Sequence, residues 1–480
     1  MIADTAFYFG VDDGMRLNPP RMDWRAVPLW GLSLIAWACG PSARARESVP
    51  DALGPDAHGC SDWPSRSGEM FVSLDGASKF EAEPFFVARP GDVAIAWEAY
   101  GCDGLTRVGY TRRVQTAGFD KRRYLESPNG QMASNVTLAR DGAGSLFAAW
   151  ASWTPGPDPA QPQVGVSDIH IQFASWPAGQ SGFGAPIELS EPIADSLYDK
   201  PWMLVTADDV IVVSYSDVRR GGILAVSSTD GGASFQRGVV DQARANLSAL
   251  CLDGRPGGVF VTYFANRSIR LAHTADGGLT WSAPVAAAVS DPSGGVAFQD
   301  PTCVANGDEA WIAYGRTHDS YDVPVERLFA VHVAHMTLGA PMPDSDVTAL
   351  DGSGAMRTIL DAGDPAPDGG IAGGIAPGFL LFPQLARWTD GSLGLAAYRA
   401  ASEDAGSADA VYVISSDGGR SFGKVIPLVT GLTPTLQRHV PDWLGDYFGW
   451  GPTAAGLGAA FVDNASGYSH VVFDEAVPAK

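Results

Sequence analysis

The chain has 480 residues, 45% of them hydrophobic and 18% charged, which suffices for a large core and excludes disorder over most of its length. Its formal net charge of −22 is opposite to the charge of a phosphate-binding surface, so nucleic acid is excluded as an expected partner. The 57 glycines and 34 prolines follow no collagen period and predict many turns. Together these features favour a β protein that works outside the cytoplasm.

Residues 1–39 have the pattern of an export segment. Met22 is a second plausible start, and the apolar run Ala26–Ala38 is too short to cross a bilayer but suits a signal peptide. The run ends at Cys39, in a setting that resembles a bacterial lipobox, so a lipidated Cys39 and a plainly cleaved signal are both open. We therefore expect a secreted, periplasmic or lipid-anchored protein, with membrane contact only through such an anchor.

Residues 40–66, rich in Ala, Pro, Ser and charge, are expected to form a flexible tether. Export would allow disulfides among Cys60, Cys102, Cys251 and Cys303. The last two occupy equivalent places in successive repeats, described next, and are candidates to pair across neighbouring units. Two buried free thiols are the alternative.

A repeated pair of strands organises residues 67–476, which we predict to be one domain. Each copy has β-branched or small apolar residues around a Gly/Asp/Asn turn, as in a buried hairpin, and helical periodicity is absent. The Gly/Pro-rich residues 352–378 read as an inserted loop. The seven copies are Glu83–Glu98, Ser134–Trp150, Lys200–Tyr215, Ser248–Tyr263, Asp300–Tyr314, Phe382–Tyr398 and Asp446–Phe461.

Three closing turns share the pattern [ST]-x-D-x-G-x-x-[FW]. They span Ser228–Phe235, Thr274–Trp281 and Ser415–Phe422. The hydroxyl and the carboxylate can bond turn amides, glycine accepts a positive φ, and the aromatic side chain folds back over the strands. We expect their aspartates to be structural rather than catalytic: Asp230, Asp276 and Asp417.

These turns are Asp-boxes, and the repeat resembles the bacterial neuraminidase repeat of the sialidase superfamily over about residues 68–475. The resemblance implies an all-β propeller of four-stranded blades. Seven copies favour seven blades, with the last blade closed by an N-terminal strand near Met70–Leu74. Six blades, as in sialidases, are the alternative.

The same resemblance suggests catalytic residues. Sialidases hold the sugar carboxylate with three arginines and use a tyrosine nucleophile with an aspartate as acid/base. Tyr447 matches the nucleophile position at the start of the last strand pair, and Asp103 lies in the loop where the acid/base is expected. Arg316 and Arg399 are candidates for carboxylate binding. The first arginine motif is missing, because Glu81–Pro84 stands in its place.

Two functions therefore compete, and a scaffold with no small-molecule site is a third possibility that needs only the repeat. One is an exo-acting glycoside hydrolase on sialic-acid-type or related glycans, and the other is a non-catalytic propeller that binds a glycan, glycoconjugate or protein at the channel mouth. No cofactor or metal motif is present in the sequence, calcium is left open, and we expect a monomer. The polar residues expected at the mouth are Asn135, Asp199, Lys200, Gln299, Asp300, Gln384 and Asp446, with Trp202 and Trp450 as possible sugar-stacking faces.

Overall fold

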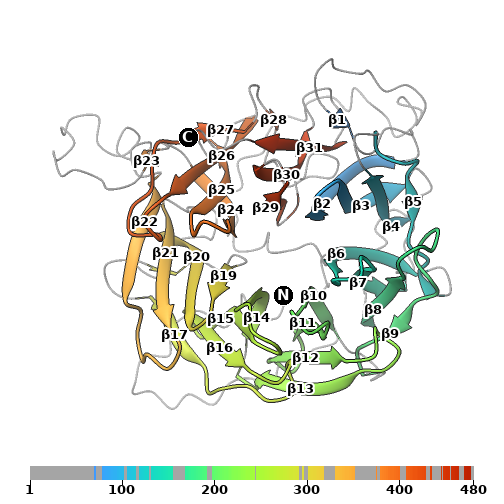
Figure 1. The fold of residues 1–480 in the computed structure, drawn as a ribbon, viewed down its shortest axis with the longest axis horizontal. Helices are drawn as coiled ribbons and strands as arrows, with labels where there is room; N and C mark the ends of the chain where they lie inside the picture. The colour runs from blue at the N-terminus through green and yellow to red at the C-terminus, as the bar shows by residue number, and fades with distance from the viewer. Residues whose placement is uncertain are drawn as a thin grey trace, which may run out of the picture.

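The strands form seven sheets arranged in a ring around a central axis, a seven-bladed β-propeller (Figure 1). The computed structural model describes residues 70–476. Gaps in that description are 72–77, 102–104, 115–117, 129–130, 155–167, 192–196, 244, 291–294, 297–300, 318–329, 352–373, 376–378, 401–406, 429–432, 435–444, 446, 455 and 464–469. The export segment, the tether and most of the inserted loop lie outside the described residues.

The first four blades are regular antiparallel sheets whose strands follow chain order from the axis outward. Blade 1 contains β2 Ser78–Arg89, β3 Asp92–Gly101, β4 Thr106–Val114 and β5 Arg123–Tyr124. Blade 2 contains β6 Met132–Arg140, β7 Leu146–Trp153, β8 Ile169–Trp176 and β9 Ile187–Glu188. Blade 3 contains β10 Tyr198–Val205, β11 Ile211–Asp217, β12 Ile223–Ser228 and β13 Gln236–Asp241. Blade 4 contains β14 Ala245–Leu252, β15 Val259–Ala265, β16 Ser268–Thr274 and β17 Val285–Val289.

The next two blades carry extra short strands. In blade 5 these are β18 Gly295–Val296 and β23 Gly374–Ile375, added to β19 Thr302–Asn306, β20 Glu309–Thr317, β21 Ala330–Thr337 and β22 Ser345–Asp351. Blade 6 contains β24 Phe379–Arg387, β25 Leu393–Ala400, β26 Ser407–Ser415, β27 Ile426–Pro427 and β28 Thr433–Pro434.

The last blade closes the ring by joining both ends of the domain. It contains β29 Gly449–Thr453, β30 Gly456–Asp463, β31 His470–Ala476 and β1 Met70–Phe71. Met70 pairs with Phe473 and Phe71 with Val472, so an N-terminal strand completes a C-terminal sheet. The predicted seven blades and this closure are confirmed.

The core lies between blades rather than at one centre. Each apolar cluster joins facing sheets of neighbouring blades, and Trp97 and Trp150 are wholly buried in two of them. A Cβ at position 109 of β4 would lie 2.7 Å from the Trp97 ring, so Gly109 leaves the space that this side chain fills. Burial of apolar surface at every junction holds the ring together.

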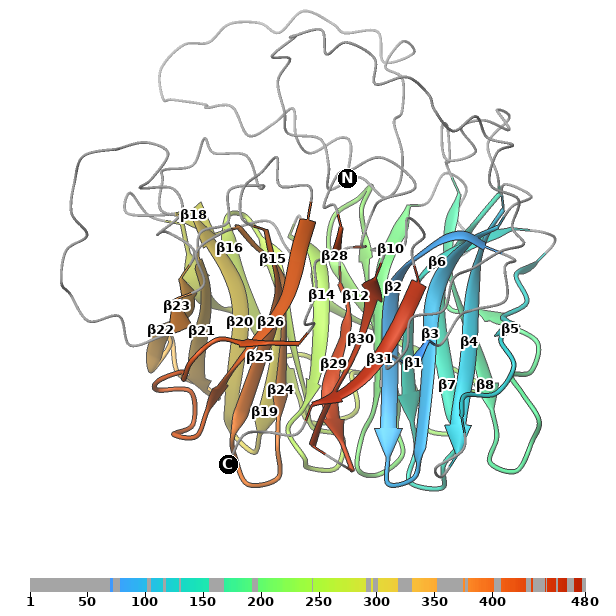
Figure 2. The same cartoon turned by 90° about the horizontal axis from the view of Figure 1, so that it is seen from above.

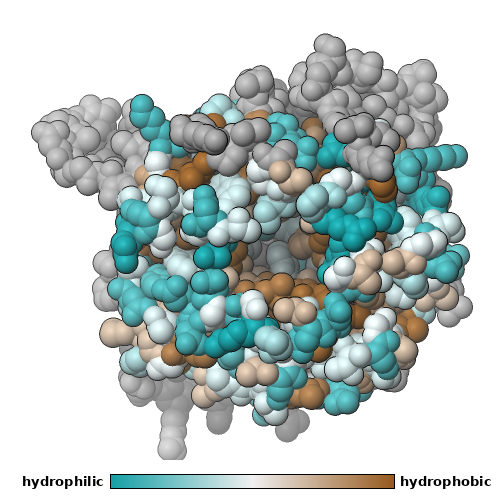
Figure 3. Space-filling view, viewed as in Figure 1, coloured by the Kyte–Doolittle hydropathy of each residue, from teal (hydrophilic) through white to brown (hydrophobic). Residues whose placement is uncertain are grey.

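The two faces of the ring differ in what they contain. β2 runs from one face to the other, with its arrowhead at the lower edge of Figure 2. Because strands alternate in direction, the turns after the first and third strands share the face where the inner strands end, which we call the turn face. This face is toward the viewer in Figure 3 and is hollowed at its centre. The opposite face, where the inner strands begin, we call the mouth.

The three closing turns lie on the turn face and form the hydrogen bonds expected of their residue types. In blade 3 the Ser228 hydroxyl donates to Asp230 Oδ1 at 2.7 Å and accepts from the Gly232 amide at 2.9 Å. The Asp230 carboxylate accepts from the Ser234 amide at 2.9 Å and from its hydroxyl at 2.5 Å. Gly232 has φ +90, which glycine adopts without strain. The same pattern recurs around Asp276 and Asp417.

A disulfide joins Cys251 of β14 to Cys303 of β19, with the two Cα atoms 5.7 Å apart. It therefore links the inner strands of blades 4 and 5, as the repeat alignment suggested. The part of the chain that the structure describes contains no helix with the length and hydrophobicity that a membrane span requires.

Acid should weaken the closing turns. Burial alone would raise the pKa of Asp417, but hydrogen bonds from Ser421 and Ser415 outweigh it and hold that pKa at about 2. The pKa of an aspartate in an unfolded chain is about 3.9. The carboxylate therefore stabilises the fold above about pH 4 and loses this contribution as the pH falls toward 2. We predict that Asp417→Asn lowers the melting temperature at pH 7 and that the difference from wild type narrows between pH 4 and pH 2. The exposed Asp474→Asn is the control, and an unchanged gap in thermal scans would contradict the prediction.

Removing the disulfide should loosen the junction of blades 4 and 5. The sequence separation of 52 residues corresponds to a stabilisation of about 4 kcal/mol in the chain-entropy description. We predict that the double variant Cys251→Ser, Cys303→Ser loses about 2–4 kcal/mol of unfolding free energy in urea titrations. A reducing agent should give wild type a similar loss while leaving the variant unchanged. Equal stability of oxidised wild type and variant would count against the prediction.

Candidate functional site

A bulge recurs in the inner strands near the mouth. The pairing register shifts between the first and second strands of blades 1, 2, 3 and 6 at equivalent points. At each bulge a residue other than glycine has a positive φ: Glu83 at 49°, Asn135 at 52°, Lys200 at 49° and Phe382 at 54°. Such conformations cost about 1–3 kcal/mol each and are concentrated at functional sites. This repeated strain marks the mouth as the candidate site.

The bulge residues of blades 1, 2 and 3 are polar and bonded to one another. Lys200 Nζ donates to Glu83 Oε1 at 3.1 Å and to Asn135 Oδ1 at 3.0 Å. Asn135 Nδ2 donates to Asp199 Oδ1 at 2.8 Å, and the Lys200 amide donates to the same oxygen at 2.8 Å. We call Glu83, Asn135, Asp199 and Lys200 the mouth cluster. It contains two carboxylates and one ammonium, so its formal charge is negative.

Most of the mouth cluster is shielded from solvent. Glu83 is 0% exposed and Lys200 is 6% exposed, whereas Asn135 is half-buried. A buried ion pair of this kind depends on both partners, because either charge left alone would be poorly solvated. Asn135 is therefore the most exposed member of the cluster.

Three aromatic rings from blades 1, 3 and 7 meet beside the cluster. The ring centroids of Phe85 and Trp202 are 5.3 Å apart, and Tyr447 lies 6.5 Å from Phe85 and 6.3 Å from Trp202, all edge to face. Lys200 Nζ lies 5.4 Å from the centroid of the Tyr447 ring, within cation–π range. Phe85 and Trp202 are each half-buried, so an aromatic surface adjoins the polar groups.

Tyr447, the predicted nucleophile, is brought to this site but is 4% exposed. Its hydroxyl donates to the backbone carbonyl of Val136 at 2.9 Å, reaching from blade 7 to blade 2. Donation to a carbonyl favours the protonated phenol, whereas nucleophilic attack requires the phenolate. The described contact is therefore structural in character.

The predicted arginines lie in ion pairs within their own blades. Arg399 Nη2 contacts Asp409 Oδ2 at 2.7 Å across β25 and β26, and Arg316 Nη1 lies 3.6 Å from Asp346 Oδ2 in blade 5. Each guanidinium thus has a carboxylate beside it in the sheet. The structure does not bring these two side chains into contact with the mouth cluster in any described interaction, and their role in carboxylate binding stays a prediction.

Blade 6 contributes a different surface to the axis. Its bulge residue, Phe382, is apolar, and the Thr302 hydroxyl of blade 5 bonds the bulge backbone by donating to the Pro383 carbonyl at 3.2 Å. Gln384 is 5% exposed, and its Nε2 atom has no hydrogen bond among the described residues. Asp103, Gln299, Asp300 and Asp446 lie outside the described residues, as do Cys39, Cys60 and Cys102. Trp450 is buried, and its Nε1 donates to the Gly394 carbonyl at 3.0 Å, so it packs between blades.

Two residues of the site were not among the predicted site residues. The sequence prediction includes Glu83 only in the segment that replaces the missing arginine motif, and it does not include Phe85. Aligning the repeats places Glu83 and Lys200 at equivalent bulge positions in two different copies. Their opposite charges were the signal in the sequence that could have indicated an ion pair. Within the described part of the chain, no group of three His, Cys, Asp or Glu side chains is arranged to hold a metal ion.

No protein family and no curated protein matches the chain. Among solved structures, it is similar to a Hadza microbial sialidase, with 13% identity over 75% of this chain and 68% of that chain and a TM-score of 0.43. It is also similar to the intramolecular trans-sialidases of Ruminococcus gnavus (8% identity, 85% and 98% covered, TM-score 0.46) and of a leech (9%, 86% and 70%, 0.45). Similarities at these identities and TM-scores concern at most the arrangement of the sheets in a ring, which the strand pairings already define.

The ion pair at the mouth can be tested by unbalancing it. Lys200→Met leaves the Glu83 carboxylate buried without its ammonium, and we predict a loss of about 3–5 kcal/mol of unfolding free energy at pH 7. Adding Glu83→Gln should restore most of that loss, because the carboxylate that faced the ammonium is then neutral and Asp199 keeps its hydrogen bonds from Asn135 and the residue 200 amide. Arg237→Gln, which removes an exposed ion pair with Glu191, is the control and should change stability by less than about 1 kcal/mol. Urea titrations that show Lys200→Met to be as stable as wild type would refute the coupling.

Proposed function

We propose that the chain is an exported propeller that binds a neutral glycan at the mouth without cleaving it. The observation that carries this proposal is the mouth cluster beside its aromatic surface. A sugar presents hydroxyl groups that donate and accept hydrogen bonds, together with apolar C–H faces. The side-chain amide of the half-buried Asn135 has both a donor and an acceptor for sugar hydroxyl groups. The half-buried Trp202 and Phe85 provide aromatic rings on which the C–H faces of a sugar can pack.

Charge favours a neutral ligand over an anionic one. The mouth cluster holds Glu83 and Asp199 against the single ammonium of Lys200, and that ammonium already bonds Glu83 at 3.1 Å. An incoming carboxylate would meet a negative local charge and gain little from Lys200. The ion pairs of Arg316 and Arg399 within their blades support the same choice.

Export is part of the proposal, with residues 1–39 as the signal and Cys39 as either a lipid anchor or a residue of the cleaved segment. The disulfide between Cys251 and Cys303 supports it, because such bonds persist mainly in oxidising compartments. We propose that the exported protein works as a monomer.

A glycosidase is the second candidate, favoured by one observation. The ammonium of Lys200 lies 5.4 Å from the Tyr447 ring centroid, and a nearby positive charge stabilises a phenolate. In this case Tyr447 would attack the glycoside as nucleophile, with Asp103 as acid/base.

Binding and turnover measurements separate the two candidates. A glycan array identifies a ligand, and calorimetry then compares wild type with Asn135→Ala. We predict at least a tenfold loss of affinity for this variant, since ligand hydrogen bonds at the mouth are lost. Asn306→Ala is the matched control, because Asn306 is exposed at the other end of an inner strand.

Turnover is measured with fluorogenic glycosides. Our proposal expects no turnover by wild type at high protein concentration. Turnover that disappears in Tyr447→Phe would overturn it in favour of the glycosidase. Absence of both binding and turnover would remove both candidates.

A further inference from the structure

Three arginines surround one carboxylate at the junction of blades 1 and 2, on the turn face. Asp92 begins β3 and is buried. Arg112 Nε and Nη2 donate to its two oxygens at 2.8 and 2.7 Å, Arg89 Nε donates at 3.1 Å, and Arg140 Nη1 donates to Oδ2 as well. Arg89 and Arg112 belong to blade 1 and Arg140 to blade 2. We call these four side chains the arginine cluster.

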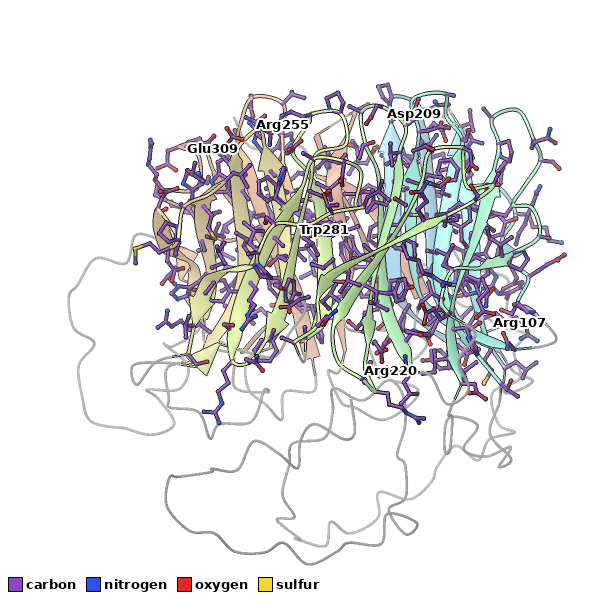
Figure 4. The ribbon with its side chains drawn as sticks, turned by 90° about the horizontal axis from the view of Figure 1, so that it is seen from below. Arg107, Asp209, Arg220, Arg255, Trp281 and Glu309 are labelled. Carbon is purple, nitrogen blue, oxygen red and sulfur yellow. A yellow bond between two sulfur atoms is a disulfide. The ribbon has the colours of Figure 1, made fainter. Side chains whose placement is uncertain are left out.

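The cluster lies at the opposite end of the ring from the mouth. Gly142, two residues after Arg140, donates its amide to Asp209 Oδ1 at 3.1 Å. Figure 4 places Asp209, Arg255 and Glu309 along one face of the ring and Arg107 and Arg220 along the other. Asp209 lies in a turn after a first strand, so the arginine cluster sits on the turn face, apart from the proposed glycan site.

The contacts at Asp92 place three guanidinium groups on one carboxylate, in a protein whose net charge is −22. The exposed Asp120 also acts on Arg112. The three arginine side chains are 41%, 17% and 8% exposed for Arg89, Arg112 and Arg140. One arginine that donates to both oxygens, as Arg112 does, would balance the charge of Asp92. The Asp92 carboxylate therefore does not by itself explain why two more arginines are present.

Arg140 has an unused hydrogen-bonding edge. Its Nε and Nη2 atoms are buried and form no hydrogen bond with any described residue, while Nη1 bonds Asp92. Nε and Nη2 lie on the same side of the guanidinium, the edge that binds two oxygens of an oxyanion in parallel. A buried donor pair without a partner is costly, and an anion would satisfy both atoms at once.

Arg89 forms the exposed side of the cluster. A Cβ at position 144 would fall 2.2 Å from Arg89 Nη1, so Gly144, with φ +93, leaves room for this guanidinium against the blade 2 turn. We propose that the junction of blades 1 and 2 binds a tetrahedral oxyanion, a sulfate or phosphate group, between the free edge of Arg140 and the terminal nitrogens of Arg89 and Arg112. The anion enters as the exposed Arg89 side chain swings outward.

Calorimetry with inorganic sulfate and phosphate tests the site, with chloride at matched ionic strength as the reference. Wild type should bind sulfate or phosphate saturably at one site. Arg140→Lys keeps the charge but loses the bidentate edge and should weaken binding at least tenfold, and Arg89→Gln should weaken it several-fold. Arg237→Gln, on the outer strand β13, should bind as wild type does.

Three results would overturn the proposal: no saturable binding beyond chloride, unchanged affinity in Arg140→Lys, or unchanged affinity in Arg89→Gln. The last variant keeps the test decisive if Arg140→Lys does not fold, because Arg89 is the most exposed of the three. Glucose 6-sulfate and glucose 6-phosphate then show whether a sulfated glycan or a phosphate monoester is preferred. Asn135→Ala should not change any of these affinities. The outcome of this test therefore does not depend on whether a glycan binds at the mouth.

Discussion

The mouth of the ring depends on one buried ammonium. Lys200 Nζ contacts side chains from blades 1, 2 and 7 through Glu83, Asn135 and the ring of Tyr447. Because a lone charge with 6% exposure would be poorly solvated, these partners must all be in place for the blades to pack as they do. The three residues whose side chains bond one another here, Glu83, Asn135 and Lys200, are also the three members of the mouth cluster that have a positive φ. Backbone strain and the buried ion pair therefore occur in the same bulges.

The two candidate sites lie on opposite faces of the ring and differ in chemistry. The mouth cluster combines two carboxylates and one ammonium with aromatic rings, which suits a neutral sugar. At the junction of blades 1 and 2 on the turn face, three guanidinium groups contact the one carboxylate of Asp92, which suits an oxyanion. Both sites form where inner-strand ends of neighbouring blades meet, so the repeated architecture supplies the positions and the individual residues supply the specificity.

Features set by local sequence were predictable. The closing turns rest on hydrogen bonds between residues four or fewer apart, such as Ser228 with Asp230, and the strand pairs rest on hairpins. Repeat equivalence favoured seven blades and made Cys251 and Cys303 candidates to pair, and the structure decided both against six blades and two free thiols. The site depends on long-range contacts: Glu83 and Lys200 are 117 residues apart, and Tyr447 and Val136 are 311 apart. No local pattern specifies such pairs. Arg399 is a different case, because Asp409 is its direct cross-strand neighbour and charge pairing could have been inferred once the strands were aligned.

A crystal structure of the protein with a neutral oligosaccharide identified by glycan array tests the central claim most directly. We predict that one sugar ring lies at the mouth, hydrogen-bonded to Asn135 and packed on Trp202, with the Lys200 to Glu83 contact intact. A sugar bound elsewhere on the ring, or a mouth in which the Lys200 ammonium has left Glu83 to bind the ligand, would contradict the account.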